Sequence, residues 1–566
     1  MDHSKSSRRD FFKLAAASCL STPLDAYHPA ASSGPRVTGV DILRRPDSVM
    51  AGFSERTLQA MHFESGSWTM PGYRLTAEPV RSGTQEELPV RLEVSSEGIT
   101  LIRLRWRDTV GDVGLTIGDQ WERAYGDLEW RGTIPNRVMP WYFFTLTSGC
   151  TAGYGVKTQP SAFCFWQRDA SGITLTLDLK NGGNPADLKG REMNLCTVVQ
   201  HITDSAVPFH LSARNFCGKM SPTPRLPRGP IFGANDWNYA YGKNTANGIL
   251  RDADLIAALA PSGSIRPHIV IDDGWQDPQR FPDMMGLSAE IKQRNLQAGI
   301  WIRPLRAPRN ALASLLLSPT RFGNEESQSV PAYDPTIPEA LEEICKAVAA
   351  PITWNYTFIK HDFSTYELFG RWGSQMGDQI SAGGWNFHDR TKTNAEIVAN
   401  LYRSIRTTAG KDTTLLGCNT IGHIAAGIFE SQRVGDDTSG TSWERTRRMG
   451  VNALAHRIAQ HGTFFHVDPD CVAITKTVGW RETSEWMNVV AQTGTSLFFS
   501  PSPDAITPEA KSAMKDAMER VIEQAGAYPQ QPTSSTTPQI WVLGRNTSQT
   551  RNYDWTADGA SPSTDV

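Results

Sequence analysis

The sequence has no excess of charge of either sign and no long apolar stretch. Its 566 residues include 56 lysines and arginines against 59 aspartates and glutamates, which leaves a formal net charge of -3. A chain this close to neutral, with no long run of one sign, has no general electrostatic means of binding nucleic acid or an anionic membrane. Beyond the N-terminus, no apolar run approaches the ~20 residues that span a bilayer. We therefore expect no nucleic-acid partner and no membrane partner for the mature chain.

Cysteine is scarce and shows no pattern. The chain has 8 cysteines, one of them Cys19, and no Cys-x-x-Cys pair. A scattered set of this kind fits neither a zinc site nor a disulfide framework. One or two disulfides stay open in an oxidising compartment, and because the remaining number is odd, at least one thiol stays free unless it pairs between chains. The cysteines beyond the N-terminus are Cys150, Cys164, Cys196, Cys217, Cys345, Cys418 and Cys471.

Signature motifs of several enzyme classes are also missing. No dinucleotide or phosphate fingerprint follows an apolar strand, and there is no His-Glu-x-x-His helix and no Ser-His-Asp elbow. Kinase, metallohydrolase and esterase interpretations therefore lack a starting point.

The N-terminus contains a pattern of residues typical of a targeting signal. Arg8 and Arg9 stand before Phe11, Phe12 and Lys13, and a short apolar run and small residues follow through position 26. This pattern resembles a twin-arginine export signal. We expect residues 1–26 to be cleaved and the mature protein to be periplasmic or secreted.

The remaining chain changes its pattern near residue 224. Residues 37–224 contain short alternating runs such as 90–94 and 172–179, punctuated by Gly, Asn and Pro, with no convincing long amphipathic helix. This predicts an N-terminal antiparallel β-sandwich. Residues 221–230 are rich in proline, which fixes its own φ and restricts its predecessor, so we expect a stiff connector there.

Residues 229–525 alternate short apolar strands with helical runs. Eight such units over about 300 residues favour a (β/α)8 TIM barrel over a doubly wound sheet. The expected strands are 231–234, 268–271, 299–302, 357–360, 414–417, 432–434, 464–467 and 496–499. The expected helices include 245–260, 337–350, 393–409, 443–459 and 508–524. Residues 526–566 are too few for a further domain and predict a short β extension and a polar tail.

Polar and aromatic residues gather where the expected barrel strands end, which is where such barrels hold their chemistry. Carboxylates, cations and tryptophans on one face suit a sugar ring, because they supply partners for hydroxyls, flat surfaces for ring faces and two carboxyl groups for bond cleavage. The candidates are Asp236, Asp272, Asp273, Trp275, Trp301, Arg303, Lys360, Asp362, Cys418, Asn419, Arg433 and Asp437.

Four short motifs at the expected strand ends, taken in order along the barrel, resemble those of the retaining α-galactosidases and raffinose-synthase-like enzymes of glycoside hydrolase family 36, and of the related family 27. An N-terminal β-sandwich is also that family's arrangement. The resemblance implies an α-galactosidase that hydrolyses oligosaccharides or polysaccharides with α-galactosyl ends by double displacement, and the N-terminal pattern adds the expectation that it is exported. The motifs are Asp272-Asp273-Gly274-Trp275-Gln276, Lys360-His361-Asp362, Arg433-Val434-Gly435-Asp436-Asp437 and Asp468-Pro469-Asp470-Cys471.

The resemblance also implies roles for single residues. Asp362 corresponds to the nucleophile and Asp437 to the acid/base. Asp272 and Asp273 correspond to binders of sugar hydroxyls far from the scissile bond. Lys360 and Arg433 correspond to ligands nearer the anomeric carbon, and Cys418 stands where the family often has a cysteine, which leaves a contact with substrate open. This mechanism needs no metal and no organic cofactor.

Elementary electrostatics agrees with the two catalytic roles. A retaining glycosidase uses one ionised carboxylate and one protonated carboxyl group, roughly 5 to 5.5 Å apart. Lys360 shares a strand face with Asp362, so we expect it to hold that carboxylate ionised. Asp436 lies beside Asp437, and we expect its negative charge to raise the pKa of Asp437.

Several assignments have structural alternatives. Asp272 and Asp273 also suit caps of the following helix, and Asp362 also suits a structural ion pair with Lys360. Local chemistry does not separate Asp436 from Asp437, and only the register of the resemblance favours Asp437. Trp275 and Trp301 either stack on the sugar or pack the barrel rim.

The chain departs from the family pattern in three places. The C-terminal β-domain is nearly absent, which leaves open what covers the last barrel helices. Gly435 stands where many relatives have Ser, with a changed contact near the sugar 2-position as one consequence. The aromatic loop 364–392 either builds the aglycone site or is a packed excursion. A raffinose-synthase-like transglycosylase, another sugar preference and a non-catalytic carbohydrate-binding protein stay open, and oligomeric state is not indicated.

Overall fold

The computed structural model describes residues 39–83, 85–96, 98–108, 114–544 and 548–556. The expected export signal at 1–26 lies outside these residues, and export stays a prediction. Within the described ranges, no helix combines the length and apolarity of a membrane span. The seven cysteines of this part are all free thiols, and Cys345 alone among them is not buried.

The first part of the chain forms two antiparallel sheets whose strands alternate along the sequence, so the expected β-sandwich is confirmed. One sheet has the order β10 (Met139–Pro140), β13 (Phe163–Asp169), β14 (Gly172–Asp178), β8 (Leu101–Arg107), β1 (Ser48–Gly52) and β2 (Gln59–Ala60). The other has the order β3 (His62–Glu64), β4 (Ser67–Met70), β5 (Tyr73–Ala77), β7 (Gln85–Val94), β17 (Glu192–Asp204), β12 (Cys150–Val156), β11 (Tyr142–Leu146) and β9 (Leu115–Gly118), with β6 (Val80–Ser82) also on β7. Every second residue of β8, from Ile102 through Leu104 to Trp106, is fully buried, which is the alternation that defines the inner face of such a sheet.

The sequence-based expectation of no long helix before residue 224 is wrong. Helix α1 spans Phe209–Met220, and its buried residues Ala213, Phe216, Cys217 and Met220 follow a helical spacing. The ring of Phe216 packs on β12, where a Cβ at Gly153 would lie 2.5 Å from it. The stripe is only two turns long and contains small residues, so its helical period was too weak to stand out among the strand patterns.

The expected (β/α)8 barrel is confirmed. Seven parallel strands are neighbours in chain order: β18 (Phe232–Asn235), β19 (His268–Ile271), β20 (Gln297–Ile302), β21 (Phe358–His361), β22 (Thr414–Gly417), β23 (Ser431–Arg433) and β24 (His466–Asp468). The eighth, β26 (Leu497–Pro501), returns to pair with β18 and with β25 (Val472–Ile474). Ser496 N donates to Val467 O at 2.9 Å, so the ring closes between the last strand and an interrupted seventh strand.

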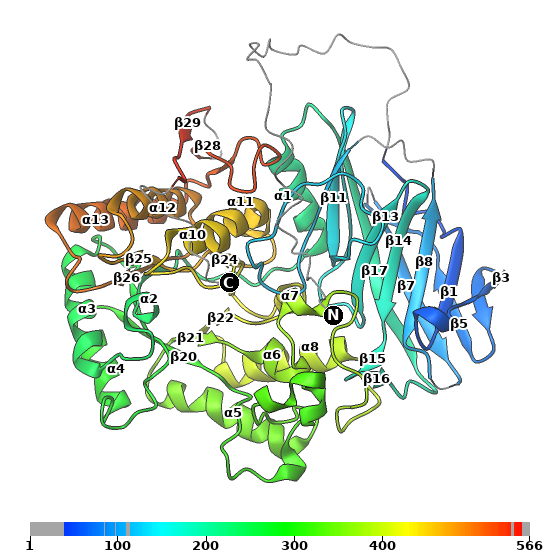
Figure 1. The fold of residues 1–566 in the computed structure, drawn as a ribbon, viewed down its shortest axis with the longest axis horizontal. Coiled ribbons are helices and arrows are strands. Elements are labelled where there is room, and N and C mark those ends of the chain that lie inside the picture. The colour runs from blue at the N-terminus through cyan, green and yellow to red at the C-terminus, as the bar shows by residue number, and fades with distance from the viewer. Residues whose placement is uncertain (1–38, 84, 97, 109–113, 545–547, 557–566) are drawn as a thin grey trace, which may run out of the picture. The chain divides into compact units, whose positions relative to one another are not determined.

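The connecting helices surround these strands (Figure 1). The long ones are α3 (Ala246–Leu259), α4 (Met284–Gln293), α5 (Pro338–Thr353), α8 (Asn394–Ala409), α12 (Trp480–Thr493) and α13 (Pro508–Glu523). The short ones are α2 (Trp237–Ala240), α6 (Ser364–Phe369), α7 (Gly373–Met376), α9 (Gly422–Ala425), α10 (Trp443–Thr446) and α11 (Ala453–Arg457). Thr245, Thr393 and Thr507 cap α3, α8 and α13 by accepting a backbone N–H, which is why these helices begin where the sequence predicted. The expected helix 443–459 contains a π-helical stretch at Arg447–Asn452.

A short sheet covers the last barrel helices. It consists of β27 (Tyr528–Pro529), β28 (Ile540–Val542) and β29 (Thr550–Asn552). Tyr553 Oη donates to Asn488 Oδ1 on α12 at 2.8 Å, and Trp443 Nε1 on α10 donates to Trp555 O at 3.0 Å. The expected short β extension is therefore present and packs on these helices.

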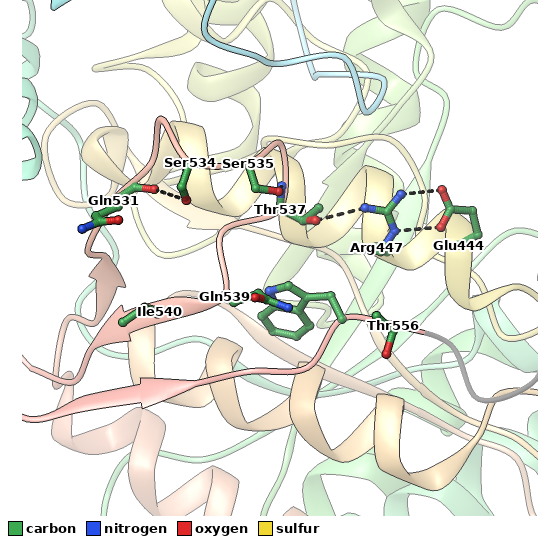
Figure 2. A pocket seen from close by; sticks show the side chains of 10 residues that line it. Glu444, Arg447, Gln531, Ser534, Ser535, Thr537, Gln539, Ile540 and Thr556 are labelled. Atoms are coloured by element: carbon green, nitrogen blue, oxygen red, sulfur yellow. Dashed lines mark hydrogen bonds and ion pairs between the residues drawn. The ribbon is translucent and has the colours of Figure 1, made fainter. Parts of the chain in front are cut away.

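A hollow of about 700 Å³ lies between this extension and α10 (Figure 2). Arg447 binds both carboxylate oxygens of Glu444 and donates to Thr537 Oγ1 at 3.0 Å. The carboxylate at this hollow is thus already paired, and the surrounding residues are mostly serine, threonine and glutamine. The hollow lacks the two facing carboxyl groups that glycoside cleavage needs.

Candidate active site

A second cavity, of about 450 Å³, lies where the barrel strands end. Seven of the candidates from the sequence line it, and they are Asp272, Asp273, Trp301, Arg303, Lys360, Asp362 and Asp437. The other lining residues are Arg123, Tyr125, Trp237, Phe363, Trp372, Ser374, Gln375 and Asp436. Among the described residues, no group of three or more His, Cys, Asp and Glu side chains is placed to hold a metal ion.

Asp362, the predicted nucleophile, follows β21 and is held by three N–H donors. Trp301 Nε1 donates to Oδ2 at 3.0 Å, and the backbone N–H groups of Asn419 and Phe363 donate to Oδ1 at 3.0 and 2.7 Å. Hydrogen bonds to an ionised acceptor are the strong kind, so this cradle stabilises a carboxylate and fixes its orientation. Phe363 has φ 65°, a left-handed conformation that is costly for a bulky residue. The backbone is thus strained at Phe363, the residue directly after Asp362.

Lys360 has a different partner from the one that alternation along the strand suggested. Its Nζ lies 2.7 Å from Asp272 Oδ2, and both side chains are buried. The lysine side chain reaches past the intervening strand to β19, whereas Asp362 lies beyond the strand end, where the backbone turns at Phe363. The alternative of a structural ion pair between Lys360 and Asp362 is therefore wrong, whereas the expectation that Lys360 helps to keep Asp362 ionised stays a prediction.

The strand-two carboxylates are not helix caps. Asp283 caps the following helix α4. Asp272 instead accepts from Asn235 Nδ2 at 2.8 Å and from the backbone of Asp273 at 2.9 Å. Asp273 accepts from Gln276 Nε2 at 3.1 Å. Both carboxylates are thus free of the helix and line the cavity, where hydroxyl groups would reach them.

Asp436 and Asp437 both line the cavity but differ in their contacts. Asp436 uses both oxygens, with Arg123 Nη2 at 2.8 Å on Oδ1 and Arg445 Nη2 at 2.8 Å on Oδ2. Asp437 is bound through Oδ1, with Arg433 Nη1 at 3.1 Å and Arg123 Nη1 at 3.7 Å. Its side chain is 33% exposed, against 14% for Asp436. Asp437 is the more accessible of the two, as its predicted role requires.

The pKa of Asp437 departs from the sequence-based expectation. Burial favours the neutral acid, but the positive charges of Arg123, Arg433, Lys360 and Arg445 prevail and lower the pKa of Asp437 to about 2. The expected rise caused by Asp436 is wrong, because Asp436 is itself neutralised by Arg123 and Arg445. Two of the four cations come from segments that do not adjoin strand six in the chain.

The sequence missed the contribution of residues 121–126. Ala124 N donates to Val434 O and Asp436 N donates to Ala124 O, both at 2.8 Å, so this segment adds to the backbone directly after β23, the sixth barrel strand. The addition places Arg123 and Tyr125 at the cavity. The available signal was the pair of charged residues Glu122 and Arg123 beside Trp121 within the β-region, but nothing in it indicates the barrel as their partner.

The aromatic loop 364–392 has two parts. Residues of its first part line the cavity, namely Trp372, Ser374 and Gln375. The ring of Trp372 stacks on that of Tyr366, with 4.5 Å between the ring centroids. Its second part packs on the hairpin of β15 (Lys180–Asn181) and β16 (Asn184–Pro185), for example through Gly183 N to Trp385 O at 3.0 Å. The second part is therefore a packed excursion, and a role of the first part in an aglycone site stays a prediction.

Five predicted site residues lie behind the cavity wall. Asp236 accepts the backbone N–H of Asp272 at 2.9 Å, and burial together with the nearby Asp272 raises the pKa of Asp236 to about 7. Trp275 Nε1 donates to Trp301 O at 2.8 Å, so Trp275 packs the rim while Trp301 lines the cavity.

The other three support strands five and six. Asn419 holds Asp362 through its backbone. Burial strongly raises the pKa of the Cys418 thiol, whose Sγ lies 3.5 Å from Arg123 Nη1. Arg433 forms ion pairs with Asp468 at 3.0 Å and Asp470 at 2.6 Å. Arg303, at the cavity itself, pairs with Glu367 at 2.8 Å. These residues position the lining groups.

No protein-family model matches the sequence, and no curated protein matches it. Solved structures do match. The α-galactosidase TtGalA from Thermus thermophilus, in complex with p-nitrophenyl α-D-galactopyranoside, is similar with a TM-score of 0.57 and 17% identity over 84% of this chain and 99% of that one. The galactosidase domain of the α-galactosidase-sucrose kinase AgaSK has a TM-score of 0.56 and 11% identity over 87% and 77%. A variant of the GH36 α-galactosidase AgaA from Geobacillus stearothermophilus has a TM-score of 0.55 and 14% identity over 87% and 76%. The resemblance to family 36 is confirmed at the level of the fold: this chain has the fold of the GH36 α-galactosidases.

Proposed function

We propose that the protein is a retaining glycoside hydrolase that removes terminal α-galactosyl groups from oligosaccharides or polysaccharides. The observation that carries the proposal is the cavity at the barrel strand ends, into which Asp362 and Asp437 both project from two different strands. The similar solved structures support it, because TtGalA is in complex with p-nitrophenyl α-D-galactopyranoside in one and with stachyose in another.

In the first chemical step, Asp362 attacks the anomeric carbon and the glycosidic bond breaks. Asp437 gives its proton to the leaving oxygen, so a covalent glycosyl-enzyme and a free alcohol result. The N–H groups of Trp301, Asn419 and Phe363 hold the attacking carboxylate in line, which reduces the entropy that the step must lose.

In the second step, water replaces the alcohol. The Asp437 carboxylate takes a proton from that water as its oxygen attacks the anomeric carbon, and Asp362 leaves as a carboxylate. Two inversions give net retention at the anomeric carbon. Asp437 ends protonated, which is the form that the next first step needs and which its low pKa favours only at acidic pH.

The other lining residues divide between two sugar sites. Asp272, Asp273 and Lys360 lie with Asp362 and are suited to the hydroxyls of the cleaved galactosyl ring. Tyr125, Trp372, Ser374 and Gln375 also line the cavity and are suited as partners for the leaving sugar.

Hydrolysis of a panel of nitrophenyl α- and β-glycosides of galactose, glucose, N-acetylgalactosamine and arabinose tests the proposal. The wild type should release nitrophenol from the α-galactoside alone, and Asp362→Asn should lower kcat/KM by at least about a thousandfold because the nucleophile is lost. Asp412→Asn, at an exposed carboxylate paired with Arg228, is the matched control and should behave as wild type.

The other outcomes are also informative. Turnover of a different sugar would support the proposed reaction type but contradict the preference for galactose. Asp272, Asp273 and the loop 364–392 would then be the residues that select the other sugar. Normal turnover by Asp362→Asn, or a stability loss as large as its activity loss, would contradict the assigned nucleophile. Release of nitrophenol from none of these glycosides would favour a carbohydrate-binding protein without catalytic activity.

A further inference from the structure

Residues 121–126 are anchored to the barrel at separate points around the cavity. Ala124 is hydrogen-bonded to strand six on both sides of Gly435. Trp121 Nε1 donates to Gly377 O at the end of α7 at 2.8 Å, and Gly373 N at its start donates to Glu122 Oε1 at 2.8 Å. Glu122 also accepts from Asn419 Nδ2, on the residue whose backbone holds Asp362. A segment fixed in this way keeps its side chains in place, as a preorganised site requires.

Arg123 is the charged residue that this segment delivers, and it is 6% exposed. Its guanidinium lies 2.8 Å from Asp436 and 3.7 Å from Asp437, and its centre is 5.5 Å from the Trp372 ring and 5.7 Å from the Tyr125 ring. Its Nε has no hydrogen-bond partner among the described residues. A buried guanidinium with an unused donor is costly, and a buried ion pair of this kind is weak evidence for a contribution to stability. A role in the active site therefore explains the burial of the Arg123 guanidinium better than a contribution to stability does.

We propose that residues 121–126 are a working part of the active site and that Arg123 is a positioning residue that orients Asp437 and sets the pH at which Asp437 holds its proton. This inference rests on the proposed function, because it takes Asp437 as the acid/base.

Arg123 comes first among the cations that act on Asp437. They are Arg123, Arg433 on β23, Lys360 on β21 and Arg445 on α10. The other charged or titratable groups at the cavity or behind it include Asp436, Asp362, Asp272, Asp273, Asp236, Arg303, Tyr125, Glu122, Glu367, Cys418, Asp468 and Asp470. Of the four cations, Arg123 is the largest single cause that lowers the pKa of Asp437, and it is the one that the barrel sequence does not supply.

The sign of the expected effect follows from the role of the acid. The kcat/KM of a general acid catalyst falls as pH rises and the acid of the free enzyme loses its proton. A low pKa of Asp437 places that fall in the acidic range. Removing the Arg123 charge should raise the pKa of Asp437 and move the fall to higher pH.

The pH profile of kcat/KM for an aryl α-galactoside tests this in four proteins: wild type, Arg123→Gln, Arg123→Lys and Arg131→Gln. Arg123→Gln should move the descending limb upward by about one pH unit or more, which is a tenfold change in proton affinity. Arg123→Lys should restore part of the difference. Arg131 belongs to the same stretch of chain but is 53% exposed and paired with Glu129, so Arg131→Gln should match wild type. An Arg123→Gln profile that is lower but unshifted would show a merely structural role and overturn the inference.

A second readout does not depend on turnover. In protein with 13C-labelled aspartate carboxyl groups, the resonance that Asp437→Asn removes should titrate at higher pH in Arg123→Gln than in wild type. If that shift occurs while no glycoside is cleaved, the proposed function fails, and of the inference only the effect of Arg123 on the pKa of Asp437 stands. If turnover is normal and neither the profile nor the resonance moves, the inference fails alone. Should Arg123→Gln not fold, a smaller upward shift in Arg123→Lys is the expected result, and no shift is the contradicting one.

Discussion

At the scale of single residues, the candidate nucleophile depends on neutral donors. Asp362 accepts one side-chain and two backbone N–H groups, and the nearby ammonium of Lys360 is occupied by Asp272. Fixed N–H dipoles stabilise a carboxylate without a covering cation in front of it. The attacking oxygen is therefore oriented while the space that a sugar needs stays open.

Trp301→Phe should lower kcat/KM roughly ten- to a hundredfold, because the ring stays but the hydrogen bond to an ionised group, worth about 1.5–3 kcal/mol, is lost. Trp275→Phe is the matched control. Its indole donates to a backbone carbonyl instead of a carboxylate, so its effect on kcat/KM should be clearly smaller. Kinetics on the α-galactoside and urea unfolding of both variants provide the measurement. Equal losses in both would mean that the indole N–H does not support the nucleophile.

At the scale of elements, the backbone directly after β23, the sixth barrel strand, is closely packed between two segments of the chain. Residue Ala124 lies along one side of it, and the π-helical stretch Arg447–Asn452 lies on the other. A Cβ at Gly435 would overlap the Met449 carbonyl oxygen and come within 2.8 Å of Ala453 Cβ. The side chain at this position would thus point into the helix. The expected changed contact near the sugar 2-position is therefore wrong, and the glycine instead allows a close approach of backbones.

Gly435→Ser should destabilise the protein by about 1–3 kcal/mol, because the added atoms overpack a buried contact with backbone. Urea unfolding at neutral pH measures the change. Gly132→Ser adds a side chain where nothing lies within 4 Å, and should leave the midpoint unchanged. If Gly435→Ser is as stable as wild type and alters only KM, position 435 faces the sugar after all.

The elements also show how far sequence patterns reach. The barrel strands and capped helices were predicted to within a few residues, because buried parallel strands are continuous apolar runs and caps are local. Helix α1 was missed because its stripe of Ala213, Phe216, Cys217 and Met220 spans two turns. The division between sandwich and barrel at residues 224 and 229 stays a prediction, since residues 38–566 form one compact unit.

At the scale of the whole molecule, burial leaves several histidines neutral. Burial lowers the pKa of His268, His361 and His466 to about 4 and that of His423 to about 3. An unfolded histidine titrates near 6.5, so between that pH and the native pKa the unfolded chain binds more protons. Each of these residues therefore lowers the free energy of unfolding as pH falls from about 6.5 toward 4. The raised pKa of Asp236 acts in the opposite sense, since this group favours the folded state more as pH falls from 7.

Because opposing groups titrate together, the comparison of a variant with wild type gives the cleaner test. His268, on β19, is buried, and desolvation is the cause of its lowered pKa. His268→Phe should therefore gain stability relative to wild type when pH is lowered from 7 to 5, by on the order of 1 kcal/mol. Urea unfolding of both proteins at the two pH values measures this difference of differences. An unchanged difference would mean that His268 is protonated normally in the fold.

The sequence by itself determined the barrel, the order of its motifs and the carboxylates at its strand ends, because these depend on periodicity and on neighbours a few residues apart. The tertiary structure alone decided the partners of the charges. Lys360 pairs with Asp272, Arg123 reaches Asp436 and Asp437 from the β-sandwich, and the pKa of Asp437 falls instead of rising. The reason is physical: Coulomb interactions and desolvation depend on distance in space and on burial. Neither is set by separation along the chain.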